Sequence, residues 1–353
     1  MENLYLKINL HNIEKNISII RNILGNKKLI AVVKGNAYGL GITKVSKFLQ
    51  DKVDMFGVSN LSEAEKLYEI GIEKEILILT PIISEDYFKN EVIKNFIVTI
   101  DSKEVISLIP ENININAHIY VCTGMNRKGI KLEELHDFIG YIQENCKNIN
   151  IKGIYTHLHN VKDQQYTLNQ IEKFHNVVNI YENKYFIHIL NSGGFAKKII
   201  REKASFAHGV RVGNLIYGYD GFNIGIKQSF SYFAKVLCLY DVKKGETIGY
   251  GCTYKCKEDK KIGMLEIGNI HHFGFYRKYK KNFLYDLLKF FYRYFVKECE
   301  LYKNNDKVHI IGKSNMNLTL IDGKNLRVGD YVKVNISPIL GDSSIHKEYI
   351  FGE

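Results

Sequence analysis

The chain has 353 residues, enough for two domains, and its 45% hydrophobic and 25% charged residues are typical of an ordinary globular protein. Its net charge of +11 comes from lysines spread along the whole sequence rather than clustered, which argues against a nucleic-acid site. With 3 prolines, a long proline-rich linker is excluded.

Six cysteines occur without a Cys-x-x-Cys pair. Cys252 and Cys256 are close in sequence, but no histidine pair lies nearby to complete a zinc site, so we expect no metal. Residues 1–7 lack the charged-then-apolar pattern of a secretion signal, and no apolar run reaches the length of a membrane span. We therefore expect free thiols in a reducing cytoplasm.

In chain order, a strand over residues 4–10 and a helix over 13–24 come first. Short apolar strands then alternate with amphipathic helices, such as those over 42–49 and 61–70. The predicted strands are 29–34, 55–59, 75–80, 96–100, 115–121, 151–157, 186–191 and 208–213. Such strands with helical crossovers predict an α/β fold with a closed (β/α)8 TIM-like barrel, and an open doubly wound sheet is the alternative.

After about residue 225 the sequence shows strand signals with little helix between them. These runs are 230–239, 261–267, 308–311, 318–321 and 331–336. They predict a C-terminal mainly-β domain over 226–353, after a barrel over 1–225 whose first strand could instead join the C-terminal domain.

Residues 276–303 stand apart within this second domain. Apolar residues recur there at helical spacing, and basic residues lie among or just before them. The pattern predicts a helical insertion that packs on the β domain. A helix that binds a membrane surface or a partner is the alternative.

Lys34 ends the apolar run over residues 29–33 and is followed by glycines at positions 35, 39 and 41. This pattern indicates a buried parallel strand with an amine at its carboxyl end and a backbone that approaches a ligand closely. A desolvated lysine can lose its proton near neutral pH and form a Schiff base with an aldehyde cofactor. The alternative is a lysine that extends from the strand end into water.

Other polar residues fall at or near the ends of the later predicted strands, where a barrel gathers its functional groups. They are Arg127, His157, Asn191, Ser192 and Arg211. If the strands form as predicted, these groups converge on one cationic pocket suited to phosphate and carboxylate.

The segment around Lys34, Ala-Val-Val-Lys-Gly-Asn-Ala-Tyr-Gly-Leu-Gly, resembles the cofactor-lysine motif of alanine racemases, which carry pyridoxal 5′-phosphate (PLP). Further segments resemble the family in the same order along the chain. They are 123–129, 155–157, 191–193, 211–213, 217–218 and 249–254, with a looser match at 312–317. The family fold is a barrel followed by a β domain. This agrees with the change after about residue 225 from alternating strands and helices to mainly strands.

The resemblance implies that Lys34 binds PLP and acts as one acid/base, and that Tyr250 of the partner subunit acts as the other. Racemisation needs proton removal on one face of Cα and proton delivery on the opposite face, so two such groups make chemical sense. A tyrosine needs cationic neighbours that lower its pKa if it is to transfer protons near neutral pH. The resemblance implies that His157 and Arg211 begin a relay of such groups toward Tyr250. Arg211 would also face the pyridine nitrogen and keep it unprotonated.

The resemblance places the cofactor phosphate beside Tyr38, Ser192 and the backbone around Gly213 and Asn214. It implies that the active site is shared between the subunits of a homodimer, because Tyr250 must reach the Lys34 of a neighbouring chain.

Arg127 and the amide of Met316 would hold the substrate carboxylate. The chain departs from the family near both. Tyr120 stands where many members carry a lysine, Asn269 replaces an entrance tyrosine, and Asn317 replaces an aspartate. The family's late phosphate-contacting tyrosine has no counterpart that we can identify.

We therefore expect a PLP-dependent racemase of L- and D-alanine that supplies peptidoglycan synthesis. A racemase of serine or another amino acid is one alternative, since the entrance differs. A PLP decarboxylase is another, although Arg211 argues against it. A catalytically weak PLP-binding paralogue that acts as a sensor or partner protein is the third, although the presence of both Lys34 and Tyr250 argues against that role.

Overall fold

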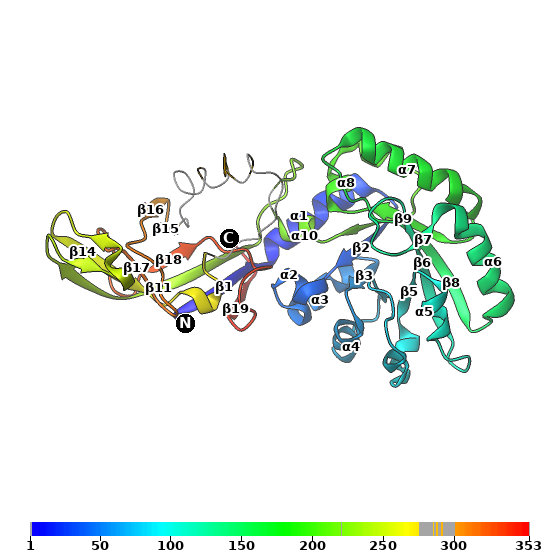
Figure 1. The fold of residues 1–353 in the computed structure, drawn as a ribbon, viewed down its shortest axis with the longest axis horizontal. Helices are drawn as coiled ribbons and strands as arrows, with labels where there is room; N and C mark the ends of the chain where they lie inside the picture. The colour runs from blue at the N-terminus through cyan, green and yellow to red at the C-terminus, as the bar shows by residue number, and fades with distance from the viewer. Residues whose placement is uncertain are drawn as a thin grey trace. The chain divides into compact units, whose positions relative to one another are not determined.

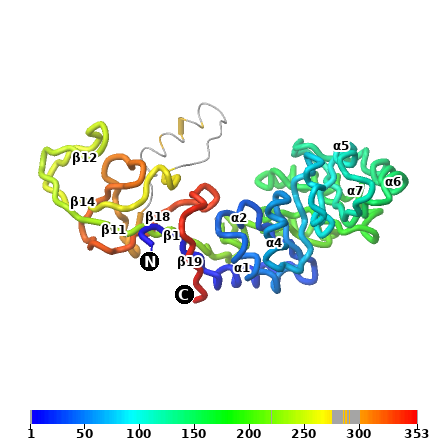
Figure 2. Tube along the Cα trace, turned by 90° about the horizontal axis from the view of Figure 1, so that it is seen from below, coloured from blue at the N-terminus to red at the C-terminus, as the bar shows by residue number. Residues whose placement is uncertain are grey.

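The computed structural model describes residues 2–219, 221–274, 285, 287, 288, 291 and 301–352. The chain divides into two compact units, His11–Gln228 and the combination of Met1–Leu10 with Ser229–Glu353 (Figures 1 and 2). In these residues we find no helix with the length and apolar content that a membrane crossing requires.

The larger unit is a closed barrel of parallel strands. Around the barrel, the strands pair in the order β5-β4-β3-β2-β10-β9-β8-β6, and pairing of β5 with β6 closes the ring. The strands are β2 (Lys28–Val32), β3 (Met55–Val58), β4 (Glu75–Ile78), β5 (Ile97–Ile100), β6 (Ile115–Cys122), β8 (Ile149–Tyr155), β9 (Phe186–Leu190) and β10 (Gly209–Val212), and short β7 (Ile130–Lys131) adds to β6. The predicted barrel is confirmed and the open sheet is excluded.

Helices follow the barrel strands. The predicted helices are present as α3 (Ile42–Leu49) and α4 (Leu61–Glu69), and α4 begins where the Asn60 side chain accepts the backbone N–H of Glu63. The helix predicted over 13–24 is present as α1 (Leu10–Leu24). The others are α2 (Lys34–Tyr38), α5 (Lys103–Ser107), α6 (Leu135–Asn145), α7 (Gln164–Val178), α8 (Ser192–Ala196), α9 (Lys198–Lys203) and α10 (Asn214–Tyr217). Short 3₁₀ turns are η1 (Gln50–Lys52), η2 (Glu85–Phe88), η3 (Glu91–Asn95), η4 (Leu132–Glu134) and η5 (Asn179–Tyr181).

The smaller unit is a mainly antiparallel sheet, which confirms the predicted C-terminal mainly-β character. Long β11 (Phe230–Val242) pairs with β1 (Leu4–Asn9), β14 (Lys260–Leu265) and β18 (Tyr331–Val334), so the first strand of the chain belongs to this unit. The remaining strands are β15 (Leu301–Lys303), β16 (Asp306–Val308), β17 (Thr319–Asp322), β19 (His346–Ile350) and the hairpin of β12 (Thr247–Ile248) with β13 (Tyr254–Lys255).

The predicted insertion over 276–303 differs from the structure at its end, because β15 begins at Leu301 and pairs with β16. Within the insertion, Tyr285, Leu287, Leu288 and Phe291 are helical, and the rest of it before Leu301 lies outside the described residues.

Candidate active site

A cavity of about 230 Å³ lies at the carboxyl ends of the barrel strands. It gathers every predicted site residue of the larger unit, together with apolar and aromatic side chains. The lining residues are Val32, Lys34, Tyr38, Leu79, Arg127, Tyr155, His157, Asn191, Ser192, Gly193, Arg211, Gly213 and Asn214.

The turn α2 that carries Lys34 and Tyr38 is left-handed. Gly35, Asn36, Ala37 and Tyr38 have φ values of 63°, 56°, 54° and 57°. This conformation costs a residue other than glycine roughly 1–2 kcal/mol, so the surrounding structure must hold it. Hydrogen bonds along the turn, such as Ala37 N–H to Val33 O at 2.7 Å, provide part of that support.

Glu63 of α4 provides the rest of the support. Its carboxylate accepts the backbone N–H groups of Gly35 at 2.6 Å, Asn36 at 3.1 Å and Ser59 at 2.8 Å. Hydrogen bonds to a charged acceptor are the stronger kind. The two from Gly35 and Asn36 fix the start of the turn against α4, and the one from Ser59 holds the same carboxylate in place. The orientation of Lys34 and Tyr38 in the cavity therefore depends on Glu63.

The surroundings of the Lys34 amine favour its neutral form. Burial lowers its pKa, the positive charges of Arg127 and Arg211 lower it further, and Glu63 partly opposes them. A larger neutral fraction near pH 7 makes this amine a better nucleophile and base.

Arg211 is buried, with 4% of its surface exposed, and its guanidinium is held by the barrel. Nη1 donates to His188 Nδ1, and Nη2 donates to the Thr156 carbonyl at 2.6 Å. The guanidinium carbon also lies 4.8 Å from the centre of the Tyr155 ring. Burial lowers the pKa of Arg211 to about 10, so it remains charged at neutral pH. These contacts fix the plane of the guanidinium in the cavity lining.

Two buried imidazoles stand behind Arg211. His188 Nε2 lies 2.9 Å from His118 Nδ1. Because an arginine only donates, His188 must accept on Nδ1 and carry its proton on Nε2, which then donates to His118. Burial and the charge of Arg211 hold both pKa values low, at about 3 for His118. The pair thus orients Arg211 without adding charge.

His157 is also neutral in this setting. Burial lowers its pKa to about 3, and the charges of Arg211, Arg127 and Lys34 act in the same direction. Its Nε2 lies 3.5 Å from the amide nitrogen of Asn191. The guanidinium of Arg211 bonds to His188 rather than to His157. In the predicted relay, Arg211 would therefore act on the neutral His157 through its positive charge and without a hydrogen bond.

Tyr38, Ser192 and Gly213 together form one part of the cavity lining. A Cβ at position 213 would lie 2.5 Å from the Tyr38 hydroxyl oxygen, so glycine is required for this approach. The Gly213 N–H donates to Ser192 Oγ at 3.1 Å. Burial raises the pKa of Tyr38 to about 12, which keeps its hydroxyl protonated and able to donate. This group of donors suits a phosphate.

Arg127 lies in the loop that follows β6. The ring of Tyr120 packs against this loop at Gly129, where a Cβ would lie 3.0 Å from the ring. Lys128 Nζ lies 3.8 Å from the buried Asp101 carboxylate. The Tyr120 hydroxyl is buried, which raises its pKa, and the nearby guanidinium of Arg127 partly opposes that shift. Ring packing and this ion pair therefore hold the Arg127 loop in a chain that lacks a lysine at position 120.

Tyr250 and Met316 belong to the smaller unit. Tyr250 begins the turn η6 (Tyr250–Cys252) and is 79% exposed, and Met316 is 69% exposed. Asn269, which begins η7 (Asn269–His271), donates its N–H to the Asn315 carbonyl at 3.0 Å, and Ile270 donates to the Met316 carbonyl at 3.0 Å. The altered entrance segment therefore supports the backbone at Met316.

Sequence reasoning gave no role to Tyr155, Glu63 or His188. Tyr155 ends β8 and lines the cavity, and its hydroxyl bonds to Thr99 Oγ1 at 2.9 Å and to the Leu79 carbonyl at 3.3 Å. Its place within the predicted strand 151–157, two residues before His157, is a usable signal. For Glu63 there is none, because Gly35 and Asn36, the residues of the turn that it holds, are distant in sequence.

Known proteins with similar sequences and folds are alanine racemases. The N-terminal domain of alanine racemase matches residues 8–221, and the C-terminal domain matches residues 229–345. An alanine racemase of Borreliella burgdorferi is 33% identical over 347 residues, covering 93% of this chain and 87% of the relative. One of Fusobacterium nucleatum is 32% identical over 355 residues, covering 97% and 93%.

Solved structures share the fold. Alanine racemase of Clostridium difficile has a TM-score of 0.81 at 22% identity, covering 98% of this chain and 89% of that chain. Alanine racemase of E. faecalis has a TM-score of 0.82 at 23% identity, covering 99% and 98%.

Proposed function

Because the chain belongs to the alanine racemase family of isomerases, we propose that it interconverts L-alanine and D-alanine with PLP as its cofactor. One observation carries the proposal. A lysine whose pKa is lowered and a buried, charged arginine line the same small cavity.

The residues present fit PLP. The Lys34 amine suits the aldehyde, Arg211 suits the pyridine nitrogen, and the hydroxyls of Tyr38 and Ser192 with the Gly213 backbone suit the phosphate. When bound, PLP supplies an electron sink that weakens the Cα–H bond of an amino acid. The amine, the cation and the phosphate-binding groups thus correspond to three separate parts of one cofactor.

Lys34 serves as the base on one face of the substrate, since its lowered pKa favours the neutral amine. Arg211 stays charged, and facing the ring nitrogen of PLP it would oppose protonation of that nitrogen. A weaker electron sink favours return of the proton to Cα over side reactions.

Tyr250 of the partner subunit serves as the acid/base on the opposite face, which requires a homodimer. The Arg127 guanidinium and the Met316 amide bind the substrate carboxylate. The relatives named alanine racemase support alanine as the substrate. The product D-alanine would serve peptidoglycan synthesis in the cytoplasm.

The test is direct. The PLP-loaded protein is incubated with L-alanine, L-serine and larger L-amino acids, and chiral chromatography follows the D-isomers. We expect D-alanine to form fastest. The Lys34→Ala variant should form none, while Lys47→Ala, which removes an exposed lysine of α3, should match the unmodified protein. A PLP-loaded protein that converts serine faster than alanine, or converts neither, would contradict the proposal.

A further inference from the structure

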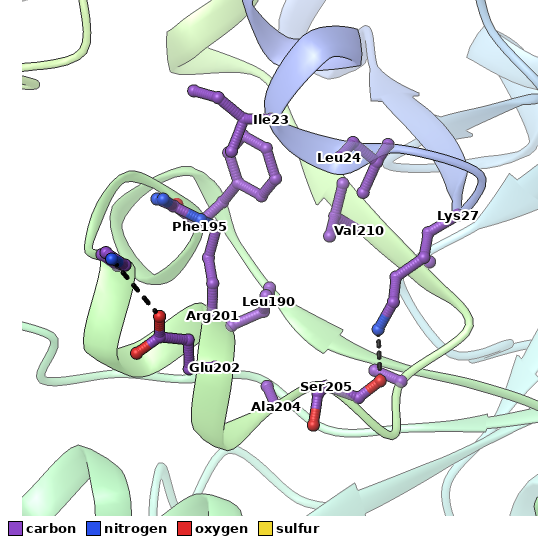
Figure 3. Close-up of a pocket in the computed structure, with 13 residues that line it drawn as sticks. Ile23, Leu24, Lys27, Leu190, Phe195, Arg201, Glu202, Ala204, Ser205 and Val210 are labelled. Carbon is purple, nitrogen blue, oxygen red and sulfur yellow. Dashed lines mark hydrogen bonds and ion pairs between the residues drawn. The ribbon is translucent and has the colours of Figure 1, made fainter.

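A second cavity, of about 300 Å³, lies in the larger unit between α1, α9 and the strands β9 and β10 (Figure 3). It shares no lining residue with the active-site cavity. Its volume is at the lower end of the range of about 300–1,000 Å³ in which small-ligand pockets fall.

The cavity has an apolar floor. Leu190 and Val210 come from the two strands, Leu24 comes from the end of α1, and Phe195 comes from α8. All four are buried, with exposed fractions of 7% or less. This floor suits a hydrocarbon chain.

Two cations flank that floor. Figure 3 shows Lys27 on one side of Leu190 and Val210, and Arg201 on the other. Lys27 Nζ donates to the Ser205 carbonyl, and Arg201 Nη1 donates to the Phe195 carbonyl. Burial lowers the pKa of both groups.

Carboxylates compensate these two cations only in part, because the charge of Glu202 raises the pKa of Arg201 against the effect of burial, whereas burial alone shifts the pKa of Lys27. In the described part of the chain, neither Lys27 nor Arg201 forms an ion pair, and the Glu202 carboxylate at the cavity pairs with Lys198 at 3.7 Å. A neutral carbonyl offsets only part of what a half-buried cation loses on leaving water. The cavity therefore combines apolar surface with an excess of positive charge, since Lys27, Lys198 and Arg201 line it beside the single carboxylate of Glu202.

We propose that this cavity binds a small amphiphilic carboxylate, of the class of medium-chain fatty acids. Its hydrocarbon chain packs on Leu190, Phe195 and Val210, and the positive charges of Lys27 and Arg201 at the two edges of this floor attract its carboxylate. Charge selects the carboxylate over a neutral compound with the same chain, and the size of the cavity excludes long acyl chains.

The test uses octanoate as the probe and the PLP-loaded protein, with binding followed by isothermal titration calorimetry or by NMR shifts. We expect saturable binding of one octanoate per chain, and binding of 1-octanol at least about tenfold weaker because it lacks the charge. Binding without saturation, or equal affinity for the alcohol, would overturn the proposal.

Two variants locate the site. Lys27→Gln and Arg201→Gln each retain a donor for the backbone carbonyl but lose the charge, so each should weaken octanoate binding about tenfold. Lys203→Gln is the matched control, because Lys203 also belongs to α9 but pairs with Glu172 at 2.8 Å and does not line the cavity. Unchanged octanoate affinity in both test variants, or an equal loss in the control, would show that the anion binds elsewhere. Racemase activity reports that each variant is folded.

Discussion

Tyr38 and Tyr155 both line the active-site cavity, yet neither is suited to transfer a proton near neutral pH. Burial raises the pKa of each phenol to about 12, so both stay protonated. Their difference lies in hydrogen bonding. Tyr155 is bonded to Thr99 and the Leu79 carbonyl, whereas Tyr38 directs its hydroxyl against Gly213. Only Tyr38 is therefore expected to donate to the cofactor.

We predict that Tyr38→Phe weakens PLP binding by about tenfold or more, since a hydrogen bond to a charged phosphate contributes about 1.5–3 kcal/mol. Absorbance or fluorescence titration of the apoprotein with PLP measures this. Tyr155→Phe is the control. It should destabilise the fold by about 1 kcal/mol through loss of the Thr99 bond but leave PLP affinity within a few fold. Equal PLP affinity in Tyr38→Phe and the unmodified protein would rule out the phosphate contact.

The buried histidines predict how stability depends on pH. The pKa of His118 is lowered from its ordinary 6.5 to about 3. Between these values the unfolded chain binds a proton that the folded chain does not, so the free energy of unfolding decreases as pH falls. One such group contributes a slope of up to about 1.4 kcal/mol per pH unit.

We predict that His118→Asn reduces the dependence of the free energy of unfolding on pH, because about one proton fewer is taken up on unfolding in acid. The substitution also lowers stability at neutral pH. Urea unfolding at a series of pH values from 7.5 down to 4.5 gives the slope directly. His346→Asn, an exposed change in β19, serves as the control and should leave the slope unaltered. A slope in His118→Asn identical to that of the unmodified protein would mean that His118 is protonated in the folded state.

At the scale of elements, α2 is the least regular segment near the site and depends on one side chain of another helix. Glu63→Gln keeps the shape of that side chain but replaces a charged acceptor of three backbone N–H groups with a neutral one. We predict a loss of about 2–3 kcal/mol in the free energy of unfolding and weaker PLP binding, because α2 orients both Lys34 and Tyr38.

Thermal unfolding and PLP titration test the role of Glu63. Glu65→Gln is a matched control on the same helix, since the Glu65 carboxylate accepts an exposed hydrogen bond from Asn90 at 3.3 Å. If Glu63→Gln and Glu65→Gln behave alike in both measurements, the left-handed turn does not need the carboxylate.

The barrel strands could be predicted because each is a short apolar run bounded by polar residues, and their order around the barrel follows from chain order. The left-handed conformation of α2 could not, because Asn36, Ala37 and Tyr38 are not residues that demand a positive φ. The turn exists because Glu63 and the following backbone hold it. Tertiary contact, rather than local preference, fixes this part of the site.

The same reasoning explains β19, which sequence analysis did not find. Its residues His346–Ile350 are mostly polar and only partly buried, so they lack the alternation of a typical strand. The strand forms because it pairs in parallel with β1 at the opposite end of the chain. Likewise, the bond from Arg211 to His188 depends on the pairing of β9 with β10 and has no local signature.

At the scale of the whole molecule, the proposed mechanism assigns its two proton-transfer groups to different subunits. Lys34 belongs to the larger unit and Tyr250 to the smaller one, where Tyr250 is 79% exposed. An acid/base that is accessible in the single chain needs a neighbouring protein surface to exclude water from the reaction. A dimer that places Tyr250 against the partner's cavity would meet that need.

Sharing of the active site predicts complementation between two inactive variants. In a dimer of Lys34→Ala with Tyr250→Phe, one site lacks both groups and the other retains both. Random pairing of equal amounts makes half of the dimers mixed, so co-expression should restore about one quarter of the activity of the unmodified enzyme. Co-expression of two differently tagged Lys34→Ala chains is the control and should remain inactive. If the mixed dimers, purified by their two tags, show no racemisation above either parent, then Lys34 and Tyr250 do not act in trans.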